Sequence, residues 1–547
     1  MEWKKNQEAQ VEITGVTAQG AGVGRLEGLA VFVPLTAPGD VARIKLLKVA
    51  KNYAWGKVTE LLTPSPLRQE PDCPQFAQCG GCCYRHITYQ GELELKAQRV
   101  RDALVRIGGF PQLPLAPILG AESRSGYRNK ALLPLGRGKD GGLTMGFYAV
   151  NSHRVVDCPR CLLQPREFDL AMEAFRQWAA QYGDPIYDEA SHTGVLRRLY
   201  LRKGFRTGEV LACVVANAPR LRHEKELVEA FREQVPGLAS VVLNVHRDKT
   251  NVALGKECRT LWGKDAIEDQ LCGLTFRLSP LSFYQVNRDQ AERLYEKAAE
   301  YAALTGEEFL LDLYCGTGTI GLSMANRAKK LLGVEVIPQA VENARENARA
   351  NGVENASFLC GDAAQAAAEL EARGERPQVV ILDPPRKGCS PELVRTVAAM
   401  APQRVVYVSC DPATLARDLK LFAQLGYPPV EATPVDMFPG TAHVETVVLL
   451  SKGEIDSKKV RVEFSLEDMD MSGFQKGATY EQIKAYVLKH TGLKVSSLYI
   501  SQVKRKCGLD VGQNYNLSKK EDAKVPQCPP EKEAAIMEAL KHFQMLE

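Results

Sequence analysis

Two apolar segments in the second half of the chain each end in a short polar motif. The first runs into DPPRKG at residues 383–388, and the second runs into SCDP at residues 409–412. Short apolar runs of this kind predict buried strands, and ligands of open α/β sheets bind at the carboxyl ends of the strands. We therefore expect the carboxylate of Asp383 and the thiol of Cys410 at neighbouring strand ends, in a reaction centre with a cysteine nucleophile.

A glycine-rich loop lies upstream of these motifs. Residues 309–314 (FLLDLY) predict a buried strand that runs into CGTGTIG at residues 315–321. The three glycines have the spacing GxGxxG, which gives a tight turn and lets a ligand approach the backbone at a helix start. With Glu335 at the end of the next strand, this loop fits either a nicotinamide dinucleotide or S-adenosylmethionine.

Three acidic residues favour S-adenosylmethionine. Asp312 lies within the strand before the loop, Asp362 follows a third strand where it can meet an adenine amine, and Asp383 closes the fourth. With these residues, the segment resembles the class I S-adenosylmethionine methyltransferases, which have a Rossmann-like α/β fold.

Cys410 narrows the resemblance further. From about residue 5 to residue 450 the chain resembles the RNA (uracil-5-)-methyltransferases, specifically the bacterial branch that makes 5-methyluridine in 23S ribosomal RNA. SFYQVN at residues 282–287 and HVETV at residues 443–447 also carry the resemblance. It implies that Cys410 is the nucleophile and Glu445 the base. It also implies that the cofactor contacts Gln285, Tyr314, Glu335 and Asp383. By their position in the sequence, we add Gly316 and Asp362 to these contacts.

Methylation at carbon 5 of uracil needs both a thiolate and a base. Carbon 5 is a poor nucleophile in the intact ring, and addition of a thiolate to carbon 6 makes it an enolate carbon that can attack a sulfonium methyl group. A carboxylate then removes the hydrogen from carbon 5 so that the thiolate is eliminated. The target base must be unstacked or presented in a single strand to reach such a pocket.

Each of these residues also has a simpler interpretation. A cysteine at the end of a buried strand is most often a small packing residue, but Cys410 stands in the SCDP motif behind a cofactor loop. Glu445 alone would predict a solvated strand residue, and its role rests mainly on the resemblance. Asp383 can instead cap the following segment, and Arg386 stands where amino-group methyltransferases usually carry an aromatic residue.

A second group of cysteines lies nearer the N-terminus. Cys73, Cys79 and Cys82 have the spacing C-x5-C-x2-C, and Cys158 follows after a long gap. Four thiolates suit an iron-sulfur cluster or a structural zinc ion, and the resemblance implies a 4Fe-4S cluster on these four residues. Because Cys161 forms its own C-x2-C pair with Cys158, a zinc site that uses Cys161 stays open.

Composition sets the limits within which these motifs operate. With 547 residues, 45% hydrophobic and 25% charged, the chain can bury several cores, and we expect three or four domains.

No apolar run approaches the roughly 18 residues that span a bilayer, and the start MEWKK is not followed by a signal-peptide segment. Fifteen cysteines then predict reduced thiols, metal and a cytoplasmic location rather than disulfides. With a net charge of +4, RNA affinity must come from local patches.

We expect four regions along the chain. Residues 1–62 contain short alternating strands and glycine-rich turns, which predict a β-barrel that resembles the RNA-binding TRAM domain. Its cations and aromatic residues can bind phosphates and stack on bases, although a solvated strand face would look the same. Residues 63–275 predict a β-rich central domain that carries the cysteines and contacts RNA, with a helix at 90–107 that can pack on the catalytic domain at 276–453.

The C-terminal extension, residues 454–547, goes beyond the resemblance. Residues 479–490 and 496–506 predict two helices around a glycine turn, and the second ends in KRK. Such a pair permits a helix-turn-helix type of nucleic-acid binder, but any small helical domain has a similar pattern.

The sequence therefore predicts a cytoplasmic methyltransferase that forms 5-methyluridine in 23S ribosomal RNA through a covalent adduct between Cys410 and carbon 6 of uracil. One rival is a transfer RNA uracil-5-methyltransferase, which usually lacks the barrel and the cysteine set. Another is an iron-sulfur RNA-binding protein or oxidoreductase, which would not need Cys410. No obligate protein partner and no membrane association are expected.

Overall fold

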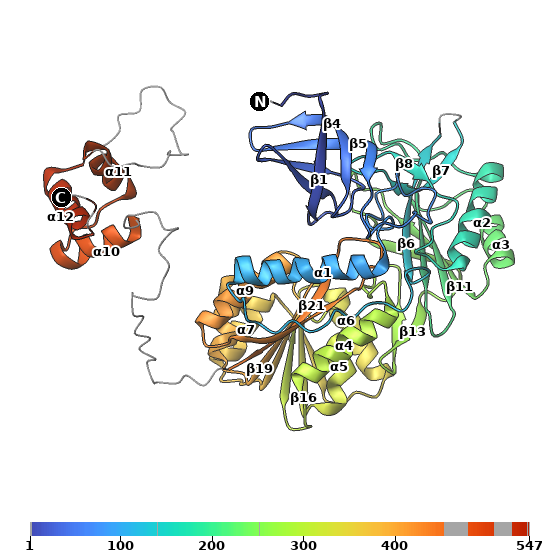
Figure 1. Ribbon diagram of the computed structural model, residues 1–547. Coiled ribbons are helices and arrows are strands. Elements are labelled where there is room, and N and C mark those ends of the chain that lie inside the picture. The colour runs from blue at the N-terminus through green and yellow to red at the C-terminus, as the bar shows by residue number, and fades with distance from the viewer. Residues whose placement is uncertain are drawn as a thin grey trace. The chain divides into compact units, whose positions relative to one another are not determined.

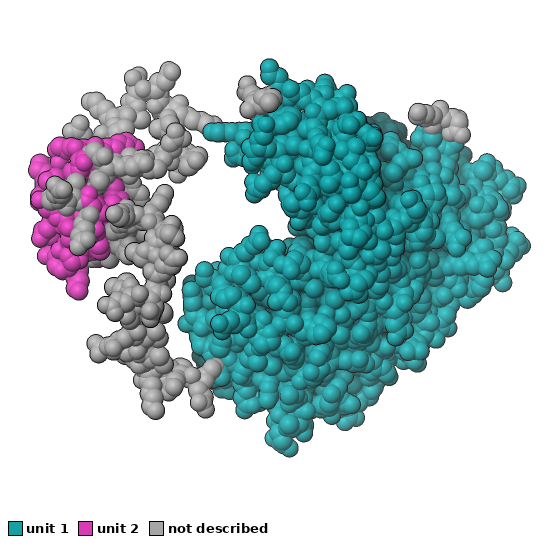
Figure 2. All heavy atoms as spheres, viewed as in Figure 1, with its two compact units in different colours: residues 1–455 teal, residues 456–547 magenta. Residues whose placement is uncertain are grey.

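The computed structural model describes residues 3–138, 141–250, 252–452, 480–507, 528–543 and 545. The chain forms two compact units, residues 1–455 and residues 456–547 (Figure 2). The larger unit contains a barrel and two seven-stranded sheets, which we call the central sheet and the 309–451 sheet (Figure 1). Within the described residues, no helix is long and apolar enough to cross a membrane.

The N-terminal strands form a closed barrel in the order β1-β2-β3-β5-β4. Strands with one buried face alternate inward and outward residues, and Val11 and Ile13 on one strand and Val31 and Val33 on another fill the interior. The strands are β1 (Glu8–Val16), β2 (Gly22–Leu26), β3 (Leu29–Val33), β4 (Val41–Val49) and β5 (Tyr53–Thr63).

The central sheet has the order β12-β11-β10-β9-β6-β7-β8. Its strands are β6 (Lys130–Arg137), β7 (Leu143–Tyr148), β8 (Val155–Asp157), β9 (Leu196–Lys203), β10 (Val210–Ala216), β11 (Leu238–Val245) and β12 (Glu257–Gly263). Two helices, α2 (Arg166–Tyr182) and α3 (Glu224–Gln234), cover one face through apolar residues such as Phe175 and Phe231. On the other face, Tyr200 and Val242 share a core with the 309–451 region.

The 309–451 sheet has the order β17-β16-β15-β18-β19-β21-β20, and β21 is antiparallel to both of its neighbours. Its strands are β15 (Phe309–Leu313), β16 (Lys330–Glu335), β17 (Ala356–Cys360), β18 (Val379–Leu382), β19 (Arg404–Ser409), β20 (Pro429–Val435) and β21 (Glu445–Ser451). The central strands are nearly continuous apolar runs because both faces are covered. The hairpin β13 (Ile267–Leu271) and β14 (Leu274–Leu278) precedes this region.

Helices cover both faces of the 309–451 sheet. One core holds α4 (Arg288–Ala302), α5 (Thr319–Met324) and α6 (Pro338–Ala350), and a short 3-10 turn, η2 (Ala325–Arg327), follows α5. The other core holds α7 (Ala363–Ala372), α8 (Pro391–Ala399) and α9 (Pro412–Gln424). The α1 helix (Tyr89–Ala103) continues into the π-helical turn η1 (Leu104–Gly108) and packs on α9 and β20 (Figure 1).

The smaller unit contains α10 (Tyr480–Thr491), α11 (Ser497–Lys506) and α12 (Pro530–His542). Apolar residues from all three helices, among them Ile483, Ile500 and Ile536, form one core. Ser496 caps α11 by accepting a hydrogen bond from the Tyr499 amide at 3.3 Å. Thr479, which we expected to start the first helix, lies outside the described residues. The sequence analysis had not predicted α12.

The predicted fold class is confirmed. The larger unit has the Rossmann-like α/β sheet of a class I methyltransferase, an N-terminal closed barrel and a β-rich central region. The topology sends the carboxyl ends of β15 to β19 and the start of β21 to one edge of the sheet, where the predicted residues lie.

Candidate active site

The register between β19 and β21 brings Cys410 and Glu445 to the same sheet edge. Ser409, the last residue of β19, lies opposite Thr446 of the antiparallel β21. Cys410 follows Ser409 and Glu445 precedes Thr446, so both residues lie just beyond this last pair, at the same sheet edge. Glu445 itself pairs with Val435 of β20, and its carboxyl group is close enough to Cys410 to raise the pKa of the thiol. Glu445 is only 5% exposed, whereas Cys410 is partly exposed.

Asp383 reaches this edge from the neighbouring strand. Leu382 at the end of β18 pairs with Tyr407 of the parallel β19, so Asp383 leaves the sheet beside the strand that carries Cys410. Burial raises the pKa of Asp383 to about 7. A carboxyl group with such a pKa carries only part of its charge near neutral pH.

The titratable groups at this edge influence one another. Burial, reinforced by Asp383, raises the pKa of Glu445 to about 8, and Arg386 opposes this rise. Burial raises the pKa of Cys410 to about 11; Glu445 and Asp383 act in the same direction, and Arg386 lowers it. Burial lowers the pKa of His443 to about 4, and Arg386 is the largest electrostatic contributor. These mutual effects mean that one thiol, two carboxyl groups, an arginine and a neutral histidine are clustered here.

Asp418 ties the DPPRKG loop to the helix that follows Cys410. This α9 residue is 4% exposed, and its Oδ2 atom accepts hydrogen bonds from the Tyr407 hydroxyl at 2.7 Å and from the Cys389 amide at 2.8 Å. Gly388 has φ +74°, and a Cβ atom there would lie 2.5 Å from Asp418 Oδ2. A buried carboxylate that holds both segments fixes the loop of Asp383 and Arg386 relative to Cys410.

The glycine loop follows β15 at the same sheet edge. Tyr314 has φ +66°, a left-handed conformation that costs a non-glycine residue energy and is often found at functional sites. Gly316 has φ +56°, and a Cβ atom there would meet no heavy atom within 4 Å among the described residues. The Gly316 and Ile337 amides donate to the Glu335 carboxylate at 3.1 Å and 2.9 Å. The backbone around Gly316 is therefore open to a ligand.

The surroundings of this loop suit a cationic, partly apolar ligand. Phe283, Val336 and Ile337 are 59%, 60% and 57% exposed although they are large and apolar. Asp312 is buried, and its Oδ1 atom makes no hydrogen bond within the described residues. Burial raises the pKa of Asp312 to about 8, and Asp383 and Glu335 add to the rise. Exposed apolar side chains beside a group of carboxylates fit S-adenosylmethionine, which has an adenine ring and a positively charged sulfur.

Two other predicted cofactor residues have different settings. Asp362 is exposed and caps α7 by accepting hydrogen bonds from the Ala364 and Gln365 amides at 2.9 Å and 3.2 Å. Gln285 precedes α4, and its backbone oxygen accepts a hydrogen bond from the Asn129 side chain at 2.8 Å. Asp362 follows β17 at the carboxyl edge, whereas Gln285 lies in the segment that connects the central region to α4.

The predicted metal ligands face a common cavity. Among the described residues, no group of three or more His, Cys, Asp or Glu side chains lies as a metal ion would require. The thiols instead line a cavity of about 260 Å³ in the larger unit; the five lining cysteines are Cys73, Cys79, Cys82, Cys158 and Cys161. Cys161, which sequence reasoning left as an alternative ligand, is therefore part of the same cavity wall.

Cations also line this cavity. Arg128 and Lys130 are among its lining residues, and burial lowers the pKa of Lys130 to about 8. In the described part of the chain, Arg128 Nε and Gln164 Oε1 are buried without a hydrogen bond, and Gln164 lines the cavity as well. A cluster held by four thiolates is anionic, so this lining of thiols and cations fits such a group.

Several features of the site were missed by sequence reasoning. The proximity of Cys410 and Glu445 depends on the antiparallel insertion of β21, and the electrostatic reach of Arg386 depends on a loop anchored by Asp418. Arg386 belongs to the DPPRKG motif and was visible in the sequence, but no spacing in the sequence links Asp418 to that loop.

Comparisons with known proteins agree with this architecture. The sheet order and the open glycine loop define a class I S-adenosylmethionine-dependent methyltransferase. One family model, described as TRAM domain, matches residues 2–59, and another, described as tRNA (Uracil-5-)-methyltransferase, matches residues 220–453. The chain belongs to the S-adenosylmethionine-dependent RNA (uracil-5-)-methyltransferase family.

Its relatives support the same assignment over most of the chain. Uncharacterized RNA methyltransferases from Clostridium tetani and Halalkalibacterium halodurans are 44% and 42% identical over 448 and 446 residues, and each match covers 82% of this chain and 97% of the relative. A crystal structure of Pyrococcus abyssi tRNA (uracil-54, C5)-methyltransferase in complex with S-adenosyl-L-homocysteine is 30% identical with a TM-score of 0.65, and the match covers 81% of this chain and 100% of that chain. The protein is thus an RNA methyltransferase enzyme.

Proposed function

We propose that this protein forms 5-methyluridine in 23S ribosomal RNA, with Cys410 as the nucleophile and Glu445 as the base. The observation that carries the proposal is that β19 and β21 end their ladder at Ser409 and Thr446, so that Cys410 and Glu445 both lie at the carboxyl edge, where Glu445 influences the pKa of the thiol. A lone strand-end cysteine is usually a packing residue. A partly exposed cysteine near a buried carboxyl group, beside Asp383 and Arg386, has the groups that the reaction needs.

The two residues act in sequence on the uracil ring. The Cys410 thiol first loses its proton to solvent. The thiolate sulfur adds to carbon 6, and the electron pair of the carbon 5–carbon 6 bond moves toward the carbonyl at carbon 4, which makes carbon 5 nucleophilic. S-adenosylmethionine supplies the methyl group that carbon 5 acquires. The ionised form of Glu445, which Arg386 favours, then takes the proton from carbon 5, the electrons of that bond restore the double bond, and the Cys410 thiolate leaves.

The electrostatics of the edge govern when the thiol ionises. The raised pKa of Cys410 keeps the thiol protonated in the free enzyme near neutral pH, which limits its reaction with other electrophiles. Arg386 is the cation that lowers this pKa. A second positive charge placed near Asp383 and Glu445 would offset their effect on the thiol and favour the thiolate.

The same edge would hold the cofactor. We assign its contacts to residues of the four parallel strand ends and of the segment before α4, namely Gln285, Tyr314, Gly316, Glu335, Asp362 and Asp383. The open backbone at Gly316 and the exposed apolar residues after Glu335 support this assignment.

We further propose that Cys73, Cys79, Cys82 and Cys158 hold a 4Fe-4S cluster. Their common cavity and the cations in its wall support a sulfur-ligated anionic group. Zinc bound with the help of Cys161 is the alternative, because this fifth thiol lines the same cavity.

Transfer RNA is the second candidate substrate. The Pyrococcus abyssi protein, which its crystal structure names as a tRNA methyltransferase, is matched over its full length. A barrel followed by a methyltransferase sheet is therefore not enough to assign ribosomal RNA.

One experiment distinguishes the substrates. Anaerobically purified protein is incubated with labelled S-adenosylmethionine and separate pools of unmethylated 23S ribosomal RNA and transfer RNA, and 5-methyluridine is quantified by nucleoside mass spectrometry. We expect product in the ribosomal RNA pool alone. Product in transfer RNA alone would overturn the substrate assignment and leave the chemistry intact, whereas no product in either pool would overturn the proposed activity.

A further inference from the structure

The segment between β20 and β21, residues 436–444, leads directly into Glu445. We call it the 436–444 loop. It contains no helix or strand, yet Asp436 and Met437 are both 0% exposed. A buried loop needs partners for its polar groups, and those partners determine where Glu445 begins the next strand.

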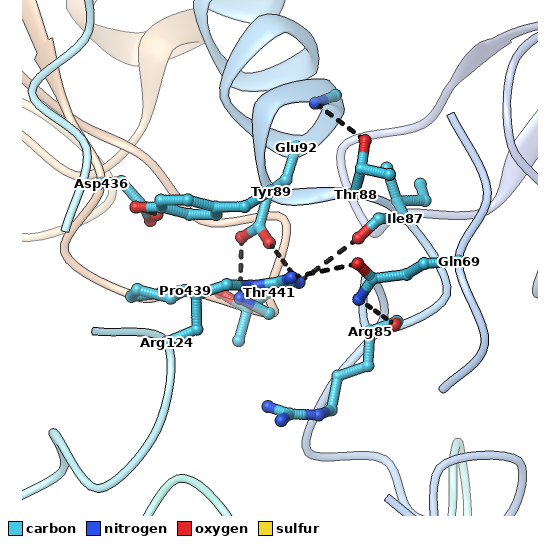
Figure 3. Close-up of polar contacts among 12 residues, drawn as sticks. Gln69, Arg85, Ile87, Thr88, Tyr89, Glu92, Arg124, Asp436, Pro439 and Thr441 are labelled. Atoms are coloured by element: carbon cyan, nitrogen blue, oxygen red, sulfur yellow. Dashed lines mark hydrogen bonds and ion pairs between the residues drawn. The ribbon is translucent and has the colours of Figure 1, made fainter. Parts of the chain in front are cut away.

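A buried ionic cluster anchors the start of this loop to α1. Lys96 Nζ lies 2.6 Å from Asp436 Oδ1 and 2.7 Å from Glu92 Oε1, and it donates to the Phe438 oxygen at 3.2 Å. The side chains of Glu92, Lys96 and Asp436 are at most 1% exposed. The Tyr89 hydroxyl donates to Asp436 Oδ2 at 2.8 Å (Figure 3). Two turns of one helix thus hold the residue where the loop begins.

The middle of the loop is held by the same helix and by the cysteine segment. The Gly440 amide donates to Glu92 Oε1 at 2.7 Å. The Gly440 oxygen accepts hydrogen bonds from the Cys83 and Tyr84 amides at 2.9 Å and 3.0 Å. Gly440 has φ +84°, and a Cβ atom there would lie 3.7 Å from the Cys82 sulfur. The loop therefore rests directly on the segment that carries the predicted metal ligands.

Two further contacts complete the anchoring. The Tyr127 hydroxyl donates to the Pro439 oxygen at 2.9 Å, and the Arg99 guanidinium donates to the Ala442 oxygen at 2.8 Å. Contacts to Asp436, Pro439, Gly440 and Ala442 leave the loop little freedom before Glu445.

Stability alone does not explain a buried ionic cluster. Removing charges from water costs several kcal/mol per ion, and well-packed apolar residues often give equal or greater stability. Directional contacts to Asp436 and to the Gly440 amide fix the loop in one conformation, which an apolar contact would not do. The cluster thus has the character of a positioning device.

We propose that Glu92, Lys96 and Asp436 are positioning residues that hold Glu445 where it removes the proton from carbon 5 of the methylated adduct. The inference rests on the proposed function, because it assigns these residues to the base of that reaction. In the step concerned, the carbon 5–hydrogen bond breaks, the proton moves to Glu445, the double bond to carbon 6 forms, and the carbon 6–sulfur bond breaks. Cys410 forms the adduct before this step, and it lies after β19, outside the 436–444 loop.

The test measures adduct formation and product release separately. Lys96→Met is incubated with S-adenosylmethionine and the RNA substrate; the covalent RNA–protein complex is quantified on a denaturing gel, and free 5-methyluridine is quantified by mass spectrometry. We expect release to slow by about 100-fold, which is typical of a displaced catalytic group, while the complex accumulates. Glu445→Gln serves as the reference for a lost base, and Arg101→Met removes a cation from an exposed position on the same helix as the matched control.

A milder variant keeps the test decisive if Lys96→Met does not fold, since Asp436 would then lose the Lys96 cation and Glu92 would keep only Arg124, at 3.4 Å. Tyr89→Phe removes only the hydroxyl that contacts Asp436 and the Ala121 amide, and we expect it to accumulate the complex with about tenfold slower release. If both variants lose adduct formation and release in equal proportion while Glu445→Gln accumulates the complex, the cluster only stabilises the fold and the inference is overturned. If Glu445→Gln accumulates no complex, the base assignment fails, and with it the inference.

Discussion

The sheet edge with Cys410 and the cavity lined by five cysteines place the same side chain beside charged groups of opposite sign. At the edge, burial raises the pKa of one thiol to about 11, and two carboxyl groups act in the same direction. At the cavity, the described lining residues include Arg128 and Lys130 but no Asp or Glu. Burial raises the pKa of the cavity thiols as well, for example that of Cys82 to about 12, so only the sign of the neighbouring charges differs: carboxyl groups oppose ionisation of the thiol at the edge, and cations favour it at the cavity.

Single cysteine substitutions should give the largest difference between the two regions, because each should affect either methylation or bound metal. Cys410→Ala removes the attacking sulfur, so methylation should fall by at least about 10³-fold, and no covalent RNA–protein complex should form. Bound iron should not change. Methyl transfer to RNA and iron content are measured on the same preparation, with the exposed Cys258 changed to Ser as the control. If Cys410→Ala retained methylation, Cys410 would not be the nucleophile, and the proposed functional difference between the two groups of cysteines would be contradicted.

The converse change tests the cavity. Cys82→Ser should lower bound iron from about four atoms per chain to less than one and should abolish the visible absorption of anaerobically purified protein. If Cys158 is the fourth ligand, Cys161→Ser should retain both the bound iron and the visible absorption. Stoichiometric zinc without iron in the unmodified protein would contradict the cluster, and loss of metal in Cys161→Ser alone would transfer the ligand role to Cys161.

The smallest expected effect concerns the pH dependence of stability. The pKa of Glu445 in the folded protein, about 8, lies above its ordinary value of 4.5. Its contribution to stability is fully present below pH 4.5 and is lost as the pH rises through about 8, because the folded state must then bury a charge. Glu445→Gln should therefore stabilise the protein on the order of 3 kcal/mol at pH 9 and hardly at pH 5.

Thermal unfolding midpoints at pH 5, 7 and 9 check this prediction. The exposed Glu354, which lies in a loop, is changed to Gln as the control and should leave the midpoint unchanged at every pH. A gain for Glu445→Gln that is equal at pH 5 and pH 9 would mean that Glu445 is not buried as a neutral group.

The elements that were predictable from sequence are those with local signals. Alternating strands with glycine turns predicted the barrel, and apolar runs that end in CGTGTIG, DPPRKG and SCDP predicted the strand ends of the 309–451 sheet. Each of these patterns reports on a short stretch of chain. The cysteine spacing likewise gathered Cys73, Cys79 and Cys82, which the structure places around one cavity.

The parts that were not predictable depend on contacts between distant residues. Lys96 and Asp436 are 340 positions apart, and no periodicity links them. Asp362 caps α7 through its Oδ1 atom, a role that the helix predicted after it could have indicated. The third helix of the smaller unit, α12, follows a long polar segment and begins after Pro529, so no turn signal joins it to the two predicted helices.

The anchoring of the 436–444 loop also has a consequence for biosynthesis. A ribosome releases the chain from its N-terminus, so Glu92 and Lys96 leave it long before Asp436 and Gly440, which are 340 and 348 positions later. Until then the Glu92–Lys96 ion pair of α1 lacks the partners that the loop provides, and helix and loop can dock only late in synthesis. The cysteine segment next to α1 also leaves the ribosome before Glu445 has been added to the chain. The contacts that join α1, the cysteine segment and the 436–444 loop can therefore form only after the last strands of the larger unit have been made.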